Sequence, residues 1–344
     1  MDFISRARTN TPLRCLQIEL DGLEVRLHLK LESFNPTGSI KFRTAVGLLS
    51  SFSSLSSGPI PAGTRVVEST SGNLGIALAR LLAEMDCSFM AVVDPRVSRR
   101  ALDALVCEGA QIVCVTEPDA HGGFLLNRLR MVADLCNADS RLRWTDQYNN
   151  PANPAIHRDT TALEIFRQTG GRVDKLFAAV STGGTLAGIE TGLRRLAPSI
   201  ETHAVDVKGS LVTSAVGFPH LLTGIGASRK SSFLTSMDSY QTHKIADYEA
   251  FAYCRMLADD TGLAIGGSSG AVLAASVAAI SADPEHFEHP VAVFPDSATN
   301  YVETFYDDSW LEERNTLRDV QIVQDIARQR GLRFSLNEAL REKE

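Results

Sequence analysis

The sequence lacks an apolar stretch long enough to cross a bilayer, a cysteine motif and an excess of positive charge. No uncharged apolar run approaches the length of a transmembrane helix, and residues 1–6 lack the apolar core of a signal peptide. The six cysteines show neither a Cys-x-x-Cys pair nor Cys/His ligand spacing, which argues against a zinc site. A net charge of −7 argues against nucleic acid as a partner. We therefore expect a cytoplasmic protein without a metal centre, a membrane segment or a nucleic-acid partner.

The chain is long and apolar enough to bury a large core. Its 344 residues are 44% hydrophobic and 22% charged, which is sufficient for two domains. Short apolar runs alternate with segments of helical period, as in residues 65–68 and 76–85, and again in residues 88–93 and 99–108. This alternation predicts an α/β fold of parallel sheets with helices on both faces. Such folds place their ligands in the cleft between two domains.

One lysine has an unusual setting. Lys41 ends the segment NPTGSIK (residues 35–41), which is rich in turn-forming residues and leads into a predicted helix over residues 42–50. Taken alone, a lysine in such a place is most often a solvated surface residue. Its interpretation changes when three later segments are considered.

These three segments each join an apolar run to a helical one. They are ESTSGNLG (residues 68–75), STGGT (residues 181–185) and GGSSGA (residues 266–271). A helix start with free backbone N–H groups and hydroxyl side chains suits a phosphate or a carboxylate. The glycines of residues 181–185 let the backbone approach an anion closely, so this segment is the strongest phosphate candidate. Judged singly, each segment could equally be an ordinary helix cap.

In this order and spacing, Lys41 and the three segments resemble the fold-type-II pyridoxal-phosphate enzymes of the cysteine synthase and cystathionine β-synthase family. The resemblance spans about residues 10–310 and implies the two-domain, tryptophan synthase β-like fold. It also implies pyridoxal 5′-phosphate as cofactor, held in a Schiff base by the catalytic Lys41. The other cofactor contacts that it implies are Asn73 at the 3-hydroxyl, Ser181, Thr182, Gly183, Gly184 and Thr185 around the phosphate, and Ser268 at the pyridine nitrogen.

These residue types suit the chemistry of such an enzyme. A lysine amine forms an imine with the cofactor aldehyde and can later remove the substrate Cα proton, provided that burial lowers its pKa. Ser268 would give the pyridine nitrogen a neutral partner, so that the ring is a weaker electron sink than it would be beside a carboxylate. A weaker sink favours loss of a β-substituent over transamination.

Further segments resemble one branch of the family, which joins O-phospho-L-serine to L-glutamate. The resemblance implies that O-phospho-L-serine loses phosphate to give an aminoacrylate, which the amine of glutamate attacks. The product would be N-(2-amino-2-carboxyethyl)-L-glutamate, a precursor of L-2,3-diaminopropionate in siderophore assembly. The segments are ESTSGNLGIAL (residues 68–78), VVDP (92–95), EPDAHGG (117–123), VDVKGS (205–210), GIGASR (224–229) and YDDSWL (306–311).

The same branch implies a site for both anionic groups of O-phospho-L-serine. The phosphate would meet Arg128, Tyr148 and Ser181, because a guanidinium fork pairs well with phosphate oxygens. The α-carboxylate would lie at a helix start, in a second use of the same kind of anion site. The residues implied for the α-carboxylate are Thr70, Ser71, Asn73 and Gln147.

Two other functions stay open. A cysteine synthase acting on O-acetylserine or O-phosphoserine would use the same cofactor residues, although Leu74 replaces a threonine that such enzymes often carry after the asparagine. A binding protein that keeps the fold without turnover belongs to a different class. The presence of Lys41, Asn73 and Ser268 argues against the binding protein.

The segment pattern predicts the domain organisation. A larger cofactor-binding domain is expected from residues 1–45 and 150–325, and a smaller substrate-side domain from residues 46–149. Residues 326–344 are expected to form a helical extension that adds packing or a dimer contact. Relatives in the family imply a homodimer.

Overall fold

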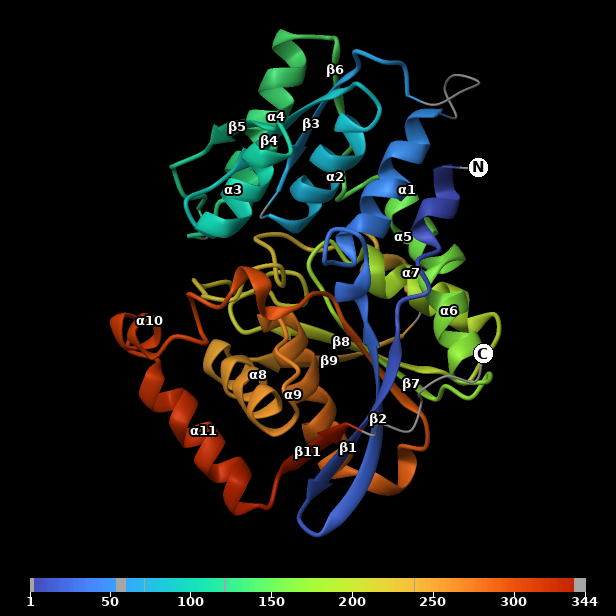
Figure 1. Ribbon diagram of the computed structural model, residues 1–344, viewed down its shortest axis with the longest axis vertical. Helices are drawn as coiled ribbons and strands as arrows, with labels where there is room; N and C mark the ends of the chain where they lie inside the picture. Colours follow the sequence, from blue (N-terminus) through green and yellow to red (C-terminus); the bar gives the residue numbers. More distant parts are fainter. Residues whose placement is uncertain (1–2, 54–59, 71, 121, 238, 337–344) are drawn as a thin grey trace.

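The computed structural model describes residues 3–53, 60–70, 72–120, 122–237 and 239–336. Its strands form two sheets, one in each of two lobes (Figure 1). The strands are β1 (Leu13–Leu20), β2 (Leu23–Leu31), β3 (Arg65–Ser69), β4 (Ser88–Val93), β5 (Gln111–Cys114), β6 (Leu142–Trp144), β7 (Lys175–Ala179), β8 (Glu201–Val207), β9 (Gln241–Ile245), β10 (Pro290–Phe294) and β11 (Arg333–Leu336).

Helices connect most of these strands. The α-helices are α1 (Lys41–Ser53), α2 (Asn73–Ala83), α3 (Arg99–Cys107), α4 (Leu125–Ala138), α5 (Ala152–Asp159), α6 (Thr161–Gln168), α7 (Gly184–Arg194), α8 (Asp247–Thr261), α9 (Gly267–Ala282), α10 (Asp308–Glu313) and α11 (Leu317–Gln329). The short 3-10 helices are η1 (Phe3–Ala7), η2 (Glu32–Phe34), η3 (Leu234–Ser236), η4 (Pro284–His286) and η5 (Ala298–Asn300).

The smaller lobe is a parallel sheet covered on both faces. Its strand order is β5-β4-β3-β6, and every neighbouring pair is parallel. Successive residues of a strand point to opposite faces, which Val66 and Val67 of β3 illustrate. Val66 belongs to the apolar cluster that includes α2, whereas Val67 belongs to a second cluster with Val132 of α4.

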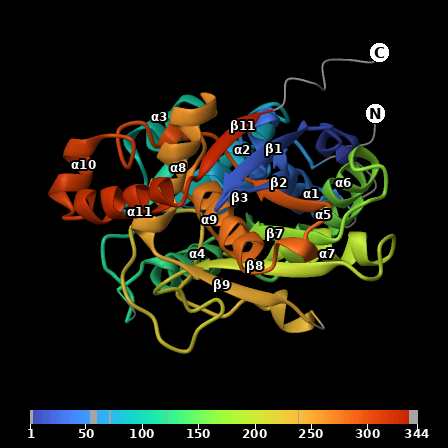
Figure 2. The same ribbon diagram turned by 90° about the horizontal axis from the view of Figure 1, so that it is seen from below.

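The larger lobe is a seven-stranded sheet of order β11-β1-β2-β10-β7-β8-β9. Leu176 of β7 belongs to the cluster that contains α7, and its neighbour Phe177 belongs to the cluster that contains α8 and α9. Seen from below, α8 and α11 lie to the left of this sheet and α5, α6 and α7 to the right (Figure 2). The predicted α/β fold with helices on both faces is therefore confirmed.

The larger sheet is mixed, whereas the sequence pattern predicts only parallel sheets. β2 is parallel to β10, but β1 is antiparallel to β2 because the tight turn at Asp21 and Gly22 joins them directly. Both turn residues have a positive φ, which aspartate and glycine tolerate better than most residues. This hairpin in residues 13–31 is not among the elements predicted from the sequence.

The prediction of a helical C-terminal extension is wrong for part of residues 326–344. After α11 ends, residues Arg333–Leu336 form β11, which pairs antiparallel with β1. Leu332 and Phe334 are both buried, at 0% and 4% exposure, which fits the alternation of a strand. The side of β1 that does not face β2 pairs with residues 333–336, and this pairing stabilises them as a strand. Residues 337–344 lie outside the described residues.

The two sheets draw on different parts of the chain. Residues 65–144 supply all strands of the smaller sheet, and residues 13–31 together with 175–336 supply those of the larger sheet. The boundaries 1–45 plus 150–325 and 46–149 stay a prediction. Among the described helices, none is long and apolar enough to cross a membrane.

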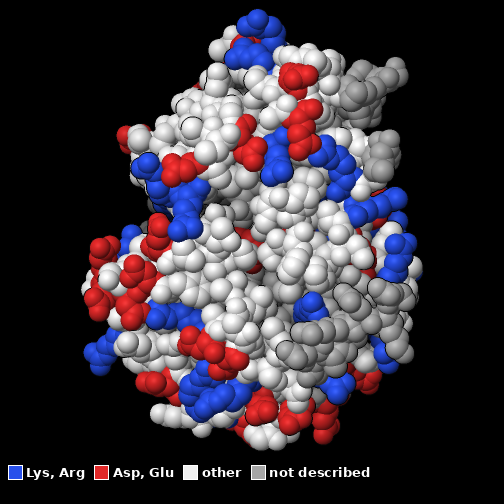
Figure 3. Space-filling view, viewed as in Figure 1, with Lys and Arg blue, Asp and Glu red and all other residues white. Residues whose placement is uncertain are grey.

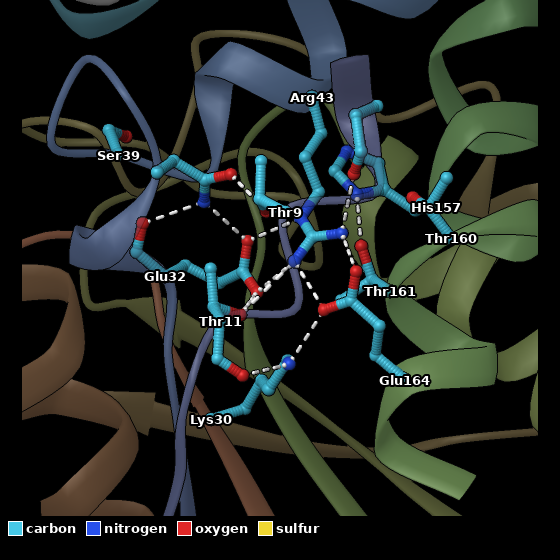
Figure 4. A network of polar contacts seen from close by, with 12 residues as sticks. Thr9, Thr11, Lys30, Glu32, Ser39, Arg43, His157, Thr160, Thr161 and Glu164 are labelled. Carbon is cyan, nitrogen blue, oxygen red and sulfur yellow. Dashed lines mark hydrogen bonds and ion pairs between the residues drawn. The ribbon is translucent and has the colours of Figure 1, made fainter. Parts of the chain in front are cut away.

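A buried network of charges fixes the start of α1. The guanidinium of Arg43, which is 0% exposed, donates from Nε and Nη2 to Glu32 at 2.8 and 3.0 Å, and from Nη1 and Nη2 to Glu164 at 2.7 Å each (Figure 4). Lys30 donates to the same Glu164 at 2.8 Å. Burial alone would lower the pKa of Arg43, but the two carboxylates raise it above its ordinary range. Arg43 therefore links α1 to the end of β2 and to α6, two residues after Lys41.

Replacing Arg43 with methionine should lower the free energy of unfolding by about 3–5 kcal/mol, because two buried carboxylates would lose their main partner. Urea denaturation measures the change. The matched control is Arg99→Met, which removes an arginine whose side chain is 82% exposed and paired with Asp103. Exposed pairs contribute little to stability. Equal effects of the two substitutions would contradict a stabilising role for the buried network.

Candidate active site

The four segments singled out in the sequence meet at one cavity of about 500 Å³ between the lobes. An adjoining hollow of about 30 Å³ extends from Lys41 along the start of α7, past Ser181, Thr182, Gly183 and Thr185. Gly184 is the first residue of α7, and Ser71 lies outside the described residues. The predicted residues that line the larger cavity are Lys41, Thr70, Asn73, Arg128, Gln147, Tyr148, Ser181 and Ser268.

Lys41 is the first residue of α1, and its amine faces this cavity. Within the described part of the chain, its Nζ makes no hydrogen bond. Burial lowers the pKa of Lys41 to about 8, and the nearby carboxylate of Asp296 opposes that change. The amine is therefore uncharged far more often at neutral pH than that of an ordinary lysine.

The start of α7 forms an anion cradle. The first N–H groups of a helix have no partner within the helix and point outward. Gly183 has φ 84°, and a Cβ there would lie 2.2 Å from the Ser231 hydroxyl, so no larger residue fits without a shift. The hydroxyl of Thr182 accepts from the Gly184 N–H at 3.3 Å and from Asn153 at 3.3 Å, which holds the loop in place.

Ser268 lies in the first turn of α9. Its side chain is 4% exposed and lines the cavity. The next residue, Ser269, faces the other way and donates to the main-chain carbonyl of Asp296 at 3.4 Å. Ser268 is thus the serine of the pair that offers its neutral hydroxyl to a ligand.

Asn73 is the first residue of α2, and its amide is fixed from two sides. Its Nδ2 donates to Asp296 Oδ2 at 2.7 Å, and its Oδ1 accepts from Asn300 Nδ2 at 3.0 Å. Both partners come from the larger lobe and line the same cavity. Asn73 therefore connects the smaller lobe to the larger one at the site.

Asp296 lines the cavity but is not among the site residues predicted from the sequence. It is 5% exposed and is the second residue after the apolar strand β10, next to Pro295. Burial raises the pKa of Asp296 to about 6, while hydrogen bonds from Tyr301 and Asn73 and the charge of Lys41 lower it. A signal was present, because polar residues that follow a buried parallel strand lie at the edge where α/β folds bind ligands.

Arg128 brings a buried guanidinium to the cavity. It projects from α4 with 6% exposure, and neither Nε nor Nη1 makes a hydrogen bond within the described residues. Its Nε lies 3.3 Å from Asp94 Oδ2. Tyr148 and Ser181 stand beside it: burial raises the pKa of Tyr148, and Arg128 together with a hydrogen bond to Ser181 opposes the rise. The Ser181 hydroxyl itself donates to the Gly226 carbonyl at 2.9 Å, so the donor that these side chains offer to the cavity is chiefly the guanidinium.

The start of α2 is organised by side chains beneath it. The hydroxyl of Thr70 accepts from the N–H groups of Gly72 and Gly75 at 3.1 and 3.0 Å, so it caps the helix. Gln147 donates from its side chain to the Ser69 carbonyl at 2.7 Å. Its backbone N–H donates to the fully buried Glu68 at 3.1 Å. Thr70 and Gln147 are thus held at the wall by their own bonds.

Arginines also line the outer part of the cavity, and no motif pointed to them. Arg96, Arg99 and Arg100 come from the loop before α3 and from its first turn. Arg100 donates to Glu303 of the larger lobe at 3.1 Å, across the mouth of the cavity. Figure 3 shows Lys and Arg side chains gathered at the left of the waist between the lobes. A mouth of this kind attracts anionic ligands.

The fold is similar to that of solved enzymes. The structure of an O-acetylserine-dependent cystathionine β-synthase from Helicobacter pylori superposes with a TM-score of 0.78 at 28% identity, covering 88% of this chain and 98% of that one. An O-ureido-L-serine synthase superposes with a TM-score of 0.77 at 26% identity, covering 91% and 99%.

Curated relatives are similar over nearly the same length. N-(2-amino-2-carboxyethyl)-L-glutamate synthase from Ralstonia nicotianae is 39% identical over 301 residues, or 88% of each chain. The enzyme of the same name from Cupriavidus metallidurans is 38% identical over 304 residues, or 88% of this chain and 89% of that one. The family model described as pyridoxal-phosphate dependent enzyme matches residues 4–296. The chain therefore belongs to the family of pyridoxal-phosphate-dependent enzymes.

Proposed function

We propose that this enzyme replaces the phosphate of O-phospho-L-serine with the amine of L-glutamate, giving N-(2-amino-2-carboxyethyl)-L-glutamate and phosphate. The observation that carries the proposal is the buried guanidinium of Arg128, which has unused donors beside the cavity that Lys41 faces. Asp94 lies 3.3 Å from Nε and balances part of the charge, but Nη1 has no hydrogen bond among the described residues, and a buried donor without a partner is costly unless a ligand completes it. The relatives named for this reaction support the choice of glutamate.

The residues fit pyridoxal phosphate. The amine of Lys41 is free and opens into both the cavity and the small hollow at the start of α7. The N–H groups of Gly183 and Thr185 would hold the phosphate, as helix starts do, while that of Gly184 donates to the Thr182 hydroxyl. Asn73 would donate to the 3-hydroxyl, and Ser268 would face the pyridine nitrogen from the first turn of α9.

The chain's own groups account for the choice of reaction. When bound, pyridoxal phosphate supplies an electron sink for the substrate Cα. Lys41, with its lowered pKa, would hold the cofactor and later remove the Cα proton as a general base. The neutral hydroxyl of Ser268 would keep the sink weak, which favours loss of a β-substituent. Gln147 and the start of α2 would orient the substrate carboxylate.

Arg128 would bind the leaving group. A phosphate dianion would accept from Nη1 of the guanidinium, because Nε faces Asp94, and Tyr148 and Ser181 line the cavity beside it. The acetyl ester of O-acetylserine is uncharged, and the acetate that leaves carries less charge than phosphate, so it would gain less from the guanidinium. This asymmetry favours O-phosphoserine over O-acetylserine.

The proposal includes a homodimer in the cytoplasm. All six cysteines are free thiols, which fits a reducing compartment. The apolar side chains of Val216 and Phe218 are 72% and 53% exposed on the long connection between β8 and β9, where a second copy could cover them.

Product analysis tests the proposed function. Purified holoenzyme is incubated with O-phospho-L-serine and either L-glutamate or sulfide, and the products are identified by mass spectrometry together with released phosphate. A secondary-amine product that requires glutamate is expected. Cysteine formed from sulfide, without a glutamate product, would instead make the protein a cysteine synthase.

Lys41→Ala should abolish turnover and the visible absorption of the bound cofactor. The wild-type apo protein should capture pyridoxal phosphate faster as the pH rises toward about 8 and then reach a plateau, because only the uncharged amine reacts. An ordinary lysine would continue to accelerate to about pH 10. Stopped-flow absorbance across this range measures the profile, and continued acceleration above about pH 9 would contradict the lowered pKa.

Arg128→Ala should reduce kcat/KM for O-phosphoserine by about 100-fold and for O-acetylserine by much less, because only the first substrate carries the charged group. The matched control is Arg130→Ala, an exposed arginine on the same helix that donates to Asn127. The control should leave both substrates unaffected. An equal loss on both substrates in Arg128→Ala would remove its role at the phosphate.

A further inference from the structure

Asp296 is a buried carboxylate that no step of the proposed reaction uses. Its Oδ2 accepts from Asn73 Nδ2 at 2.7 Å and from the Tyr301 hydroxyl at 2.9 Å. Its Oδ1 makes no hydrogen bond within the described residues, and it lies so near Gly266 that a Cβ there would be 1.9 Å away. A carboxylate placed in a cavity wall with a free oxygen is costly, so its presence requires a reason.

The main chain beside Asp296 joins two of the cavity's loops. The N–H of Ile40, next to Lys41, donates to the Pro295 carbonyl at 2.9 Å. The N–H of Gly266, at the start of the α9 segment, donates to the Asp296 carbonyl at 3.2 Å. Through its side chain Asp296 reaches a third loop, at Asn73. Three separate segments of the cavity wall are therefore tied to Pro295 and Asp296 together.

The carboxylate decides which way the Asn73 amide faces. An ionised carboxylate can only accept, so it must meet the amino group of Asn73 and not the carbonyl oxygen. The carbonyl oxygen is turned toward Asn300, which donates to it at 3.0 Å. One N–H of Asn73 is used by Asp296, and the second is left for the cavity. A flipped amide would place oxygen against oxygen at Asp296.

We propose that Asp296 is a positioning residue, whose carboxylate orients the amide of Asn73 so that an N–H points to the bound cofactor. The inference rests on the proposed function, in which Asn73 donates to the 3-hydroxyl of pyridoxal phosphate. The ionisable groups that face Asp296 are Lys41, Tyr301, Tyr306 and Cys254. Of these, Lys41 is the cation, so the same carboxylate also stabilises the protonated amine.

A double-mutant cycle tests the inference through cofactor affinity. The dissociation constant of pyridoxal phosphate is measured by fluorescence titration for Asp296→Ala, Asn73→Ala and the double variant. Asp296→Ala should weaken binding by about tenfold in the wild-type background and by little in the Asn73→Ala background, because the two residues act as one unit. The same loss in both backgrounds, or no loss in either, would overturn the proposal.

Asp296→Asn separates the acceptor from the charge. It keeps the shape and an oxygen for Asn73, so cofactor affinity should fall by less than in Asp296→Ala. Without the negative charge, the pKa of Lys41 in the apo protein should fall, which pH-dependent acetylation followed by peptide mass spectrometry measures. An unchanged Lys41 profile together with a tenfold loss of affinity would contradict the proposed geometry.

The matched control is Asp206→Asn. Asp206 is also a fully buried carboxylate, accepts from the Thr213 hydroxyl at 2.7 Å, and lies outside the cavity. This variant should leave both readouts unchanged. None of these measurements uses O-phosphoserine or glutamate. If the wild-type protein fails to bind the cofactor, the proposed function falls with the inference; if it binds and the cycle is additive, only the inference falls.

Discussion

The position of Lys41 depends on the buried guanidinium of Arg43. Its bonds to Glu32 and Glu164 attach the first turn of α1 to the end of β2 in the larger sheet and to α6. Because a helix is rigid over two residues, this anchoring also fixes the backbone of Lys41. The charges of Lys30, Arg43, Glu32 and Glu164 balance one another, and none of the four residues lines the cavity. Arg43 stabilises the start of α1, and Lys41, two residues earlier in the same helix, lines the cavity.

The cavity is built where strand ends and helix starts from the two lobes meet. Helix starts supply unpaired N–H groups at α2, α7 and α9, and each can meet an anionic or polar part of a ligand. Arg128 adds a cation of fixed charge at a distance from the helix starts. The cavity therefore has several separate places that suit anions, although the whole chain carries a net charge of −7.

The sequence was sufficient to predict the α/β fold and part of the cavity wall, because glycine- and serine-rich helix starts are local patterns. Lys41, Asn73 and Ser268 could be selected since each lies within such a pattern. Asn300 and the arginines at positions 96, 99 and 100 could not, because their roles arise from contacts between segments far apart in the chain. Asp296 follows a buried strand, which is a local signal, but its contact with Asn73 is of the same long-range kind. β11 was missed for a similar reason: its strand form depends on the free edge of β1, which no local pattern reveals.

The most direct test of the account is to locate the cofactor on the chain. Sodium borohydride reduction of the yellow holoenzyme fixes the cofactor to the amine that holds it, and peptide mass spectrometry then identifies the lysine. The account predicts a pyridoxyl group on the peptide that contains Lys41 and on no other. Modification of another lysine, such as Lys175, or of none, would contradict the assignment of the cavity as the active site.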